Sequence, residues 1–341
     1  MAYGSLMSTH ELGGAFDTAV IHVTSSAHTI TNVYAKKDGI VYTGISTGTN
    51  AFDIKINDKG TYEIWASVDG AGTSKVDSVV VSQPEEYNVE ILVVSKTLDN
   101  NSWDVIQSVS AKGNGSSYWS VGALKLIELK EWGSTITSNN KNMYVYILGF
   151  KHNQRTNDKS YNTITFCMGY LSGNYYCLTD NYYTYSKSGL YYMSDSPRYY
   201  QATLYYGQMW HILQNNLLGY FPSDLRRCLV EFYMVIRTTN NEAYSAHNAL
   251  VTLPSEFEIF GKNFYGANEG QDDYIKQYAF FASGNERVRF GGNDGYYSAR
   301  RYWTRTCGDG TNNYFVSVNE NGNAQLSSYN TNLGVTPIFC V

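Results

Sequence analysis

The residues with most potential for chemistry lie near the end of this 341-residue chain. Residues 296–306 contain four aromatic side chains and three arginines in eleven positions. Tyr, Trp and Arg dominate the hot spots of binding surfaces because they combine contact area with directional polar groups. This composition indicates non-covalent recognition. The alternative is a strand with solubilising arginines, and in either case we expect Trp303 to face the core.

Side chains in loops and at strand ends are available to a partner because the core does not need them. We therefore predict a binding surface on this segment and on the loops that follow it. The predicted contact residues are Tyr296, Tyr297, Arg300, Arg301, Tyr302, Arg305, Asn312, Asn313, Tyr314 and Tyr329. The tyrosine doublets within residues 199–206 are the second candidates for such a surface.

The catalytic and metal motifs of common enzyme classes give little support to an enzyme. The chain has no HExxH, GxxxxGK[ST] or GxGxxG sequence, and its six histidines show no metal-ligand spacing. Asn293, Asp294 and Asp309 offer oxygen ligands of the kind that Ca²⁺ takes, but no spacing motif supports a site. We predict a protein that is not an enzyme and has neither a metal nor another cofactor.

The five cysteines all follow residue 160 and include no CxxC pair, which argues against a zinc site and a disulfide framework. We predict buried thiols in a protein made in a reducing compartment. The alternative is a reactive pair, for which Cys307 and Cys340 are the candidates.

Composition restricts the possible classes further. Charged residues make up 16% of the chain and the net charge is −5, which is unfavourable for a general nucleic-acid binder. An apolar content of 43% is too high for a disordered chain, yet no apolar run reaches the ~18 residues of a membrane-spanning helix. The first 14 residues lack the pattern of a signal peptide. We expect a protein made in the host cytoplasm that does not insert into a membrane.

Alternating apolar and polar residues dominate the first quarter of the chain. The alternation is clear over residues 52–57, stops at a turn at 57–60, and resumes over 62–68. Six or seven short strands separated by turns predict an immunoglobulin-like β-sandwich over residues 15–92, after a flexible lead-in at 1–14. The composition changes at residues 84–87, where we place the domain boundary.

The remainder, residues 93–341, mixes helices with strands. Ser102 is expected to cap a helix over residues 103–111, and Asn321-Gly322 is a strong hairpin signal. We expect three further helices: one at 208–218, one that begins after Pro222 with Ser223 as its cap, and one at 271–282. We also expect a structured link at 253–261 and a closing strand at 335–341. The predicted fold class is α+β, mostly β.

A series of short motifs follows residue 100 in a characteristic order. They are NNSW (100–103), SYWSVG (117–122), ILGFKHN (147–153), PSDLR (222–226), LPSEFEIFG (253–261), YWTR (302–305), FVSV (315–318) and GVTPIF (334–339). The series resembles an uncharacterised module common in phage and prophage tail proteins. Its C-terminal part resembles the C-type-lectin-like fold, on which phage receptor-binding proteins, some diversified by retroelements, display a variable surface.

The resemblance implies a tail tip or fibre protein in the virion tail that binds a bacterial surface receptor, a glycan or a protein. It also implies contacts with other tail or baseplate proteins and a homo-oligomer. The alternative is a structural baseplate or tail decoration protein that contacts only virion proteins. Because related lectin-like folds include a Cys-oxidising enzyme, that chemistry is the third possibility, and it requires a reactive Cys pair.

Overall fold

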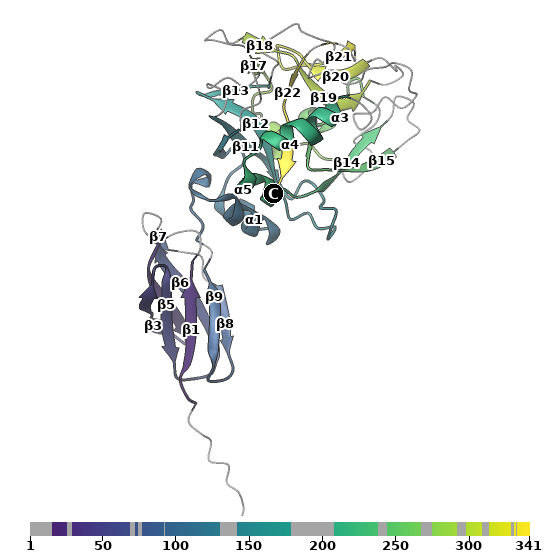
Figure 1. Cartoon of the computed structure of the whole chain (residues 1–341). Coiled ribbons are helices and arrows are strands. Elements are labelled where there is room, and N and C mark those ends of the chain that lie inside the picture. Colours follow the sequence, from purple (N-terminus) through teal and green to yellow (C-terminus); the bar gives the residue numbers. More distant parts are fainter. Residues whose placement is uncertain are drawn as a thin grey trace, which may run out of the picture. The chain divides into compact units, whose positions relative to one another are not determined.

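The structure is a computed structural model of the whole chain, and it divides into two compact units, Met1–Lys96 and Thr97–Val341 (Figure 1). It describes residues 16–25, 29–68, 72–73, 77–91, 93–129, 142–178, 208–237, 244–266, 275–291, 298–308, 314–328, 331 and 333–341. The described residues form an α+β structure that is mostly β, as predicted. The lead-in predicted at residues 1–14 lies outside the described residues.

The N-terminal unit is a sandwich of two sheets. One sheet has the order β4-β5-β1-β9, and the other has the order β3-β2-β6, with β7 and β8 both pairing with β6. The strands are β1 (Ala19–Thr24), β2 (Ile30–Lys37), β3 (Ile40–Thr43), β4 (Ile45–Gly48), β5 (Ala51–Ile56), β6 (Gly60–Val68), β7 (Gly72–Thr73), β8 (Asp77–Val81) and β9 (Glu86–Glu90). The immunoglobulin-like topology within this sandwich remains a prediction.

One core joins the two sheets of this unit. Phe52, Ile54 and Ile56 on β5 are buried together with the alternating residues Tyr62 and Ile64 on β6, as their spacing predicts. Each fully buried apolar side chain contributes about 1.5–3 kcal/mol relative to an exposed one. The sandwich is therefore held by the side chains that the alternation identifies.

Residues 84–87 are not the domain boundary, and the predicted division between 15–92 and 93–341 lies four residues before that between the two units. Residues 84–87 enter β9, which pairs in parallel with β1 inside the N-terminal sheet. The division lies after Lys96 instead. A composition change near a strand does not reveal its pairing partner, because β1 is more than 60 residues away in the sequence.

The C-terminal unit is built on two larger sheets with hairpins and short helices around them. The six-stranded sheet has the order β10-β11-β12-β23-β16, with β13 also on β12, and the four-stranded sheet has the order β21-β20-β19-β22. The strands are β10 (Leu124–Glu128), β11 (Asn142–Phe150), β12 (Ile164–Leu171), β13 (Asn174–Tyr175), β16 (Val251–Thr252), β19 (Tyr302–Cys307), β20 (Tyr314–Val318), β21 (Ala324–Ser328), β22 (Gly334–Val335) and β23 (Ile338–Cys340). Two hairpins complete the strands: β14 (Phe232–Arg237) with β15 (Tyr244–Ala249), and β17 (Arg289–Gly291) with β18 (Ser298–Arg300).

The helices of this unit are short. They are η1 (Leu98–Asn100), α1 (Trp103–Ala111), α2 (Gly115–Tyr118), α3 (Gln208–His211), a π-helical segment (Ile212–Leu217), α4 (Leu218–Tyr220), α5 (Ser223–Cys228), α6 (Glu256–Phe260) and α7 (Ala279–Ala282). Helix α1 begins where predicted, and the Ser102 hydroxyl accepts a hydrogen bond from the backbone N–H of Val105. Its Trp103 packs edge-on against Phe166 and Phe339 of the six-stranded sheet.

Three local predictions need correction. The expected helix at 271–282 is limited, within the described residues, to α7, because residues 275–278 are not helical. Ser223 is the first helical residue and Pro222 the N-cap. The expected closing strand at 335–341 is two strands in different sheets, separated by a segment containing Pro337, which has no backbone N–H to donate.

The Asn321-Gly322 turn is confirmed, with Gly322 at a φ of 78° between β20 and β21.

Candidate functional site

Strand β19, the centre of the predicted binding surface, is buried along its whole length. It lies between β20 and β22 in the four-stranded sheet, and all six of its residues are buried. Trp303 faces the core as expected, but Tyr302 and Arg305 are only 1% and 2% exposed. The prediction that Tyr302 and Arg305 contact a receptor is therefore wrong. The sequence suggested a surface strand because Arg is rarely buried without a partner.

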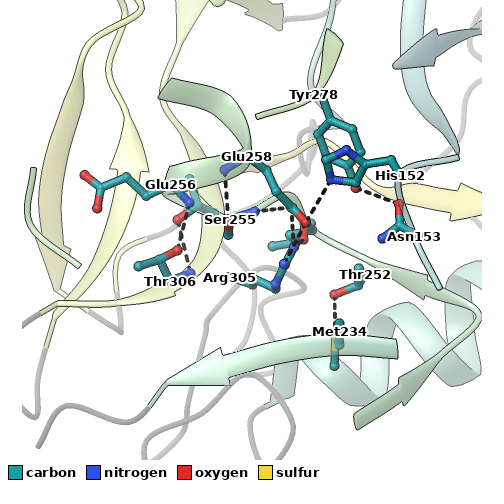
Figure 2. Close-up of polar contacts among 12 residues, drawn as sticks. His152, Asn153, Met234, Thr252, Ser255, Glu256, Glu258, Tyr278, Arg305 and Thr306 are labelled. Carbon is teal, nitrogen blue, oxygen red and sulfur yellow. Dashed lines mark hydrogen bonds and ion pairs between the residues drawn. The ribbon is translucent and has the colours of Figure 1, made fainter. Parts of the chain in front are cut away.

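The partner of Arg305 is Glu258 on α6 (Figure 2). The Arg305 guanidinium donates two hydrogen bonds to the Glu258 carboxylate, at 2.5 and 2.8 Å, and a third to the Leu253 carbonyl oxygen at 2.8 Å. Two parallel bonds between a guanidinium and a carboxylate give geometric specificity as well as energy. The pair therefore fixes α6 against β19.

Glu258 has a second task at the start of its own helix. Its carboxylate accepts the Ser255 N–H, and the Ser255 hydroxyl accepts the Glu258 N–H, which is a capping box. Burial alone would raise the pKa of Glu258, but the charge of Arg305 and the neighbouring His152 outweigh it and lower the pKa to about 2. Glu258 is thus an ionised structural group at neutral pH, and it is only 3% exposed.

His152 and Tyr278 cover this ion pair. The His152 Nε2 atom lies 3.7 Å from Glu258, and its ring stacks on Tyr278 with centroids 3.8 Å apart (Figure 2). The Tyr278 hydroxyl donates to the Asn153 side-chain oxygen, which also accepts from Thr165. Through Tyr278, which directly precedes α7, the network links α6, β12 and β19. Its role is to hold these elements in place.

Tyr302 belongs to a second buried cluster, centred on Arg289. The Arg289 guanidinium donates to the Tyr146 hydroxyl and to the carbonyl oxygens of Glu286 and Val288. Its Cζ atom lies 5.1–5.9 Å from the ring centroids of Tyr146, Tyr175, Phe281 and Tyr302. Aromatic faces attract a desolvated guanidinium, so this cluster stabilises the core.

Of the other predicted contact residues, three are described and exposed. Arg300 is the last residue of β18 and Arg301 directly precedes β19. Arg301 lies 3.2 Å from Glu320, while Tyr314 lies at the opposite end of the four-stranded sheet and is 41% exposed. Tyr302, next to Arg301, pairs with Val318. Tyr314 lies four residues before Val318 on β20, so the two ends are ~13 Å apart at ~3.3 Å per residue. The exposed members of the predicted contact set that the structure describes thus lie at two ends of one sheet. Tyr296, Tyr297, Asn312, Asn313, Tyr329 and the doublets at 199–206 lie outside the described residues.

The end of the sheet that carries Tyr314 also carries two exposed aromatic residues that the sequence did not suggest. Phe264 is 52% exposed and Tyr265 is 42% exposed. The next residue, Gly266, forms a β-bridge with Gly308, and the Gly308 N–H donates to the Tyr314 carbonyl oxygen at 3.0 Å. We call Phe264, Tyr265 and Tyr314 the aromatic edge. Exposed Tyr and Phe beside one another on fixed backbone are typical of a binding surface.

The backbone of the Phe264–Gly266 loop is held by one buried carboxylate. Glu256, the first residue of α6, has no exposed surface, and its side chain points away from the Glu258–Arg305 pair (Figure 2). Its carboxylate accepts the N–H groups of Phe264 at 3.0 Å, Tyr265 at 3.2 Å and Gly266 at 2.8 Å. The Glu256 backbone N–H in turn donates to the Thr306 hydroxyl on β19 at 2.8 Å.

Two features of the sequence could have revealed this loop. Residues 255–258 follow the S-x-x-E pattern of a capping box, and Gly261 ends the helix in the left-handed conformation with a φ of 72°. Two adjacent aromatics therefore follow a helix end and precede Gly266. The segment at 253–261, expected only as a structured link, is the element that positions the aromatic edge.

The cysteines are buried and unpaired, as predicted. Burial raises the pKa of Cys167 to about 11 and the pKa values of Cys177, Cys228 and Cys340 to about 12. Reactive thiols need a lowered pKa, so this environment disfavours the Cys-oxidising alternative at Cys340.

Other chemical sites find no support in the part of the chain that is described. No group of three or more His, Cys, Asp or Glu side chains there could hold a metal ion. Residues 44–48 match the GxSxG pattern, but Ser46 lies on the exposed strand β4 without the following helix that a nucleophile elbow requires. No helix among the described residues is long and apolar enough to cross a membrane.

Comparison with known proteins gives one match. Residues 173–341, just under half of the chain, match a family described as a domain of unknown function (DUF6273). The matched range contains α6, β19 and the aromatic edge. No curated protein and no solved structure matches the chain.

Proposed function

We propose that the protein is a phage tail tip or fibre protein that attaches the particle to a bacterial surface receptor through its C-terminal unit. The observation that carries this proposal is the aromatic edge: three exposed aromatic side chains at one end of a sheet, two of them on a loop fixed by Glu256. A binding surface gains affinity when its contact residues are ordered before the partner arrives. The immunoglobulin-like and lectin-like folds of the two units belong to the same proposal.

The aromatic edge replaces the strand residues that the sequence favoured. Tyr314 is common to both sets, whereas Tyr302 and Arg305 are needed for the core. Phe264 is oriented from two sides, because the Phe260 ring meets it edge-on at 5.5 Å and the Lys262 ammonium lies 4.5 Å from its ring centroid. A hot-spot aromatic contributes on the order of 2 kcal/mol or more when it is central and desolvated.

The test uses fluorescently labelled full-length protein and a panel of bacterial strains. We expect the unaltered protein to label at least one strain, and the Phe264→Ala/Tyr265→Ala/Tyr314→Ala variant to lose at least about tenfold in labelling. The melting temperature should change little because all three side chains are exposed. Leu126→Ala, an exposed apolar residue on another sheet, is the control and should label normally. Unchanged labelling by the triple variant would place the site elsewhere.

The second candidate function is a structural baseplate or tail decoration protein, and the N-terminal unit supplies its supporting observation. Ile40 and Val41 on β3 and Ile45 on β4 are 50–66% exposed, and both strands lie at sheet edges. Exposed apolar edge strands favour pairing with another chain. If no strain is labelled while the protein co-sediments with tail particles, the structural function gains support. An oligomer formed through this edge is compatible with either proposal.

A further inference from the structure

We propose that Glu256 is the positioning residue of the receptor-binding loop, and that receptor binding is lost on acidification because protonation of this carboxylate releases Phe264 and Tyr265. This inference rests on the proposed function, since it concerns the same surface. Glu256 itself has no exposed surface and would not touch the receptor.

The carboxylate of Glu256 alone holds three consecutive backbone N–H groups of the loop. Oε1 accepts from Phe264 and Tyr265, and Oε2 accepts from Gly266 and, at 3.4 Å, from Tyr265. An ionised carboxylate is a pure acceptor, but a protonated one carries an O–H donor. In the protonated form, one carboxyl oxygen would carry an O–H group. That oxygen would then point a hydrogen toward backbone N–H groups, which are themselves donors. The loop must then move, because a buried N–H group without an acceptor costs about 1–3 kcal/mol.

The groups that the structure describes around Glu256 include no partner ion for its charge. The charged and titratable side chains on the packed elements are Glu258 on α6, Tyr302, Arg305 and Cys307 on β19, and Lys262 and Tyr265 on the loop, while α7 carries none. Arg305 is engaged by Glu258, and among the described residues no basic group lies within ion-pair distance of Glu256. Burial therefore raises the pKa of Glu256, although the three N–H groups oppose the shift.

The direction of this shift separates loop release from unfolding. An acid whose pKa is raised in the folded state takes up its proton more readily folded than unfolded, so protonating Glu256 does not itself unfold the unit. Glu258, whose pKa is lowered to about 2, stays ionised and keeps α6 on β19 over the same pH range. Acidification between neutral pH and the low pKa of Glu258 should therefore change the loop while the sheet remains.

The experiment follows the amide signals of Phe264, Tyr265 and Gly266 by NMR in the full-length protein, from about pH 7.5 to about pH 4.5. We expect the three signals to titrate together with one apparent pKa above the usual value for Glu. In Glu256→Gln the titration should disappear. Glu286→Gln is the matched control, because the exposed Glu286 carboxylate also accepts two backbone N–H groups, those of Arg287 and Val288. It should leave the three signals unchanged.

The same variants are then compared in cell labelling at both ends of this pH range. We expect the unaltered protein to lose at least about fivefold in labelling at the acidic end, and Glu256→Gln to label weakly at both. Full labelling by Glu256→Gln, or amides that do not titrate, would overturn the inference and leave the proposed function standing. If no strain binds the unaltered protein, the proposed function fails, and the amide titration alone decides whether Glu256 anchors the loop.

Discussion

Glu256 and Glu258 lie two residues apart on one short helix and are both buried, yet their surroundings give them opposite properties. Arg305 and His152 lower the pKa of Glu258 to about 2, whereas burial raises the pKa of Glu256. The difference arises from the side of the helix that each carboxylate faces: β19 supplies an arginine to one, and a loop supplies only backbone N–H groups to the other. A permanently charged anchor and a titratable anchor thus coexist in one element.

The buried pair predicts a large effect for Arg305. We expect Arg305→Ala to lower the free energy of unfolding of the C-terminal unit by about 3–5 kcal/mol, because Glu258 would be left buried without a counter-charge. Urea unfolding monitored by near-ultraviolet circular dichroism measures it. The double variant Glu258→Gln/Arg305→Met should be less destabilised than Arg305→Ala. Equal losses would show that packing, and not charge, accounts for the effect.

At the scale of elements, the alternation of apolar and polar residues predicts strands with one buried face well and strands buried on both faces poorly. Strands β5 and β6 each have one polar face, so their alternation identified the core. Strand β19 is buried on both faces and contains Thr and Arg among its aromatics, so it resembles an exposed strand in sequence. Its burial depends on Glu258, more than 40 residues earlier in the chain, and no local pattern reveals that pairing.

The candidate site was predictable in part for the same reason. Tyr314 begins strand β20 and was recognised as an exposed position. Phe264 and Tyr265 could have been suspected from the helix end before them, but their place beside Tyr314 depends on the bridge between Gly266 and Gly308. Contacts between loops distant in sequence follow from the assembled sheet and not from local propensity.

Gly266 makes this loop sensitive to one methyl group. A Cβ atom at Gly266 would lie 2.2 Å from the Thr306 Cγ2 atom and 2.9 Å from Glu256 Oε2. We expect Gly266→Ala to displace the loop, lower cell labelling at least about tenfold and destabilise the unit by about 1–3 kcal/mol. Thr306→Ser removes the methyl but keeps the hydroxyl that accepts from Glu256. The double variant should therefore recover part of the labelling, and no recovery would contradict this explanation.

At the scale of the whole molecule, each unit has its own core, so each should unfold as its own cooperative transition. In the N-terminal unit, the ionisation of His22 makes the unfolding transition depend on pH. His22 on β1 faces Asp53 on β5, with Nδ1 2.6 Å from the carboxylate. Its Nε2 atom lies 3.5 Å from Glu86, the first residue of β9. The hydrogen bond to Asp53 raises the pKa of His22.

The sign of this shift sets the last prediction. Because the folded pKa of His22 lies above the unfolded value of ~6.5, the stabilisation is complete below that pH and is lost as the pH rises through the folded pKa. Calorimetry of the full chain should show two transitions, and only the one assigned to Met1–Lys96 should weaken over this range. The effect should be small, since His22 and Asp53 are about 30% exposed. In His22→Gln the pH dependence should vanish from that transition. One merged transition, or one unaffected by His22→Gln, would contradict independent units.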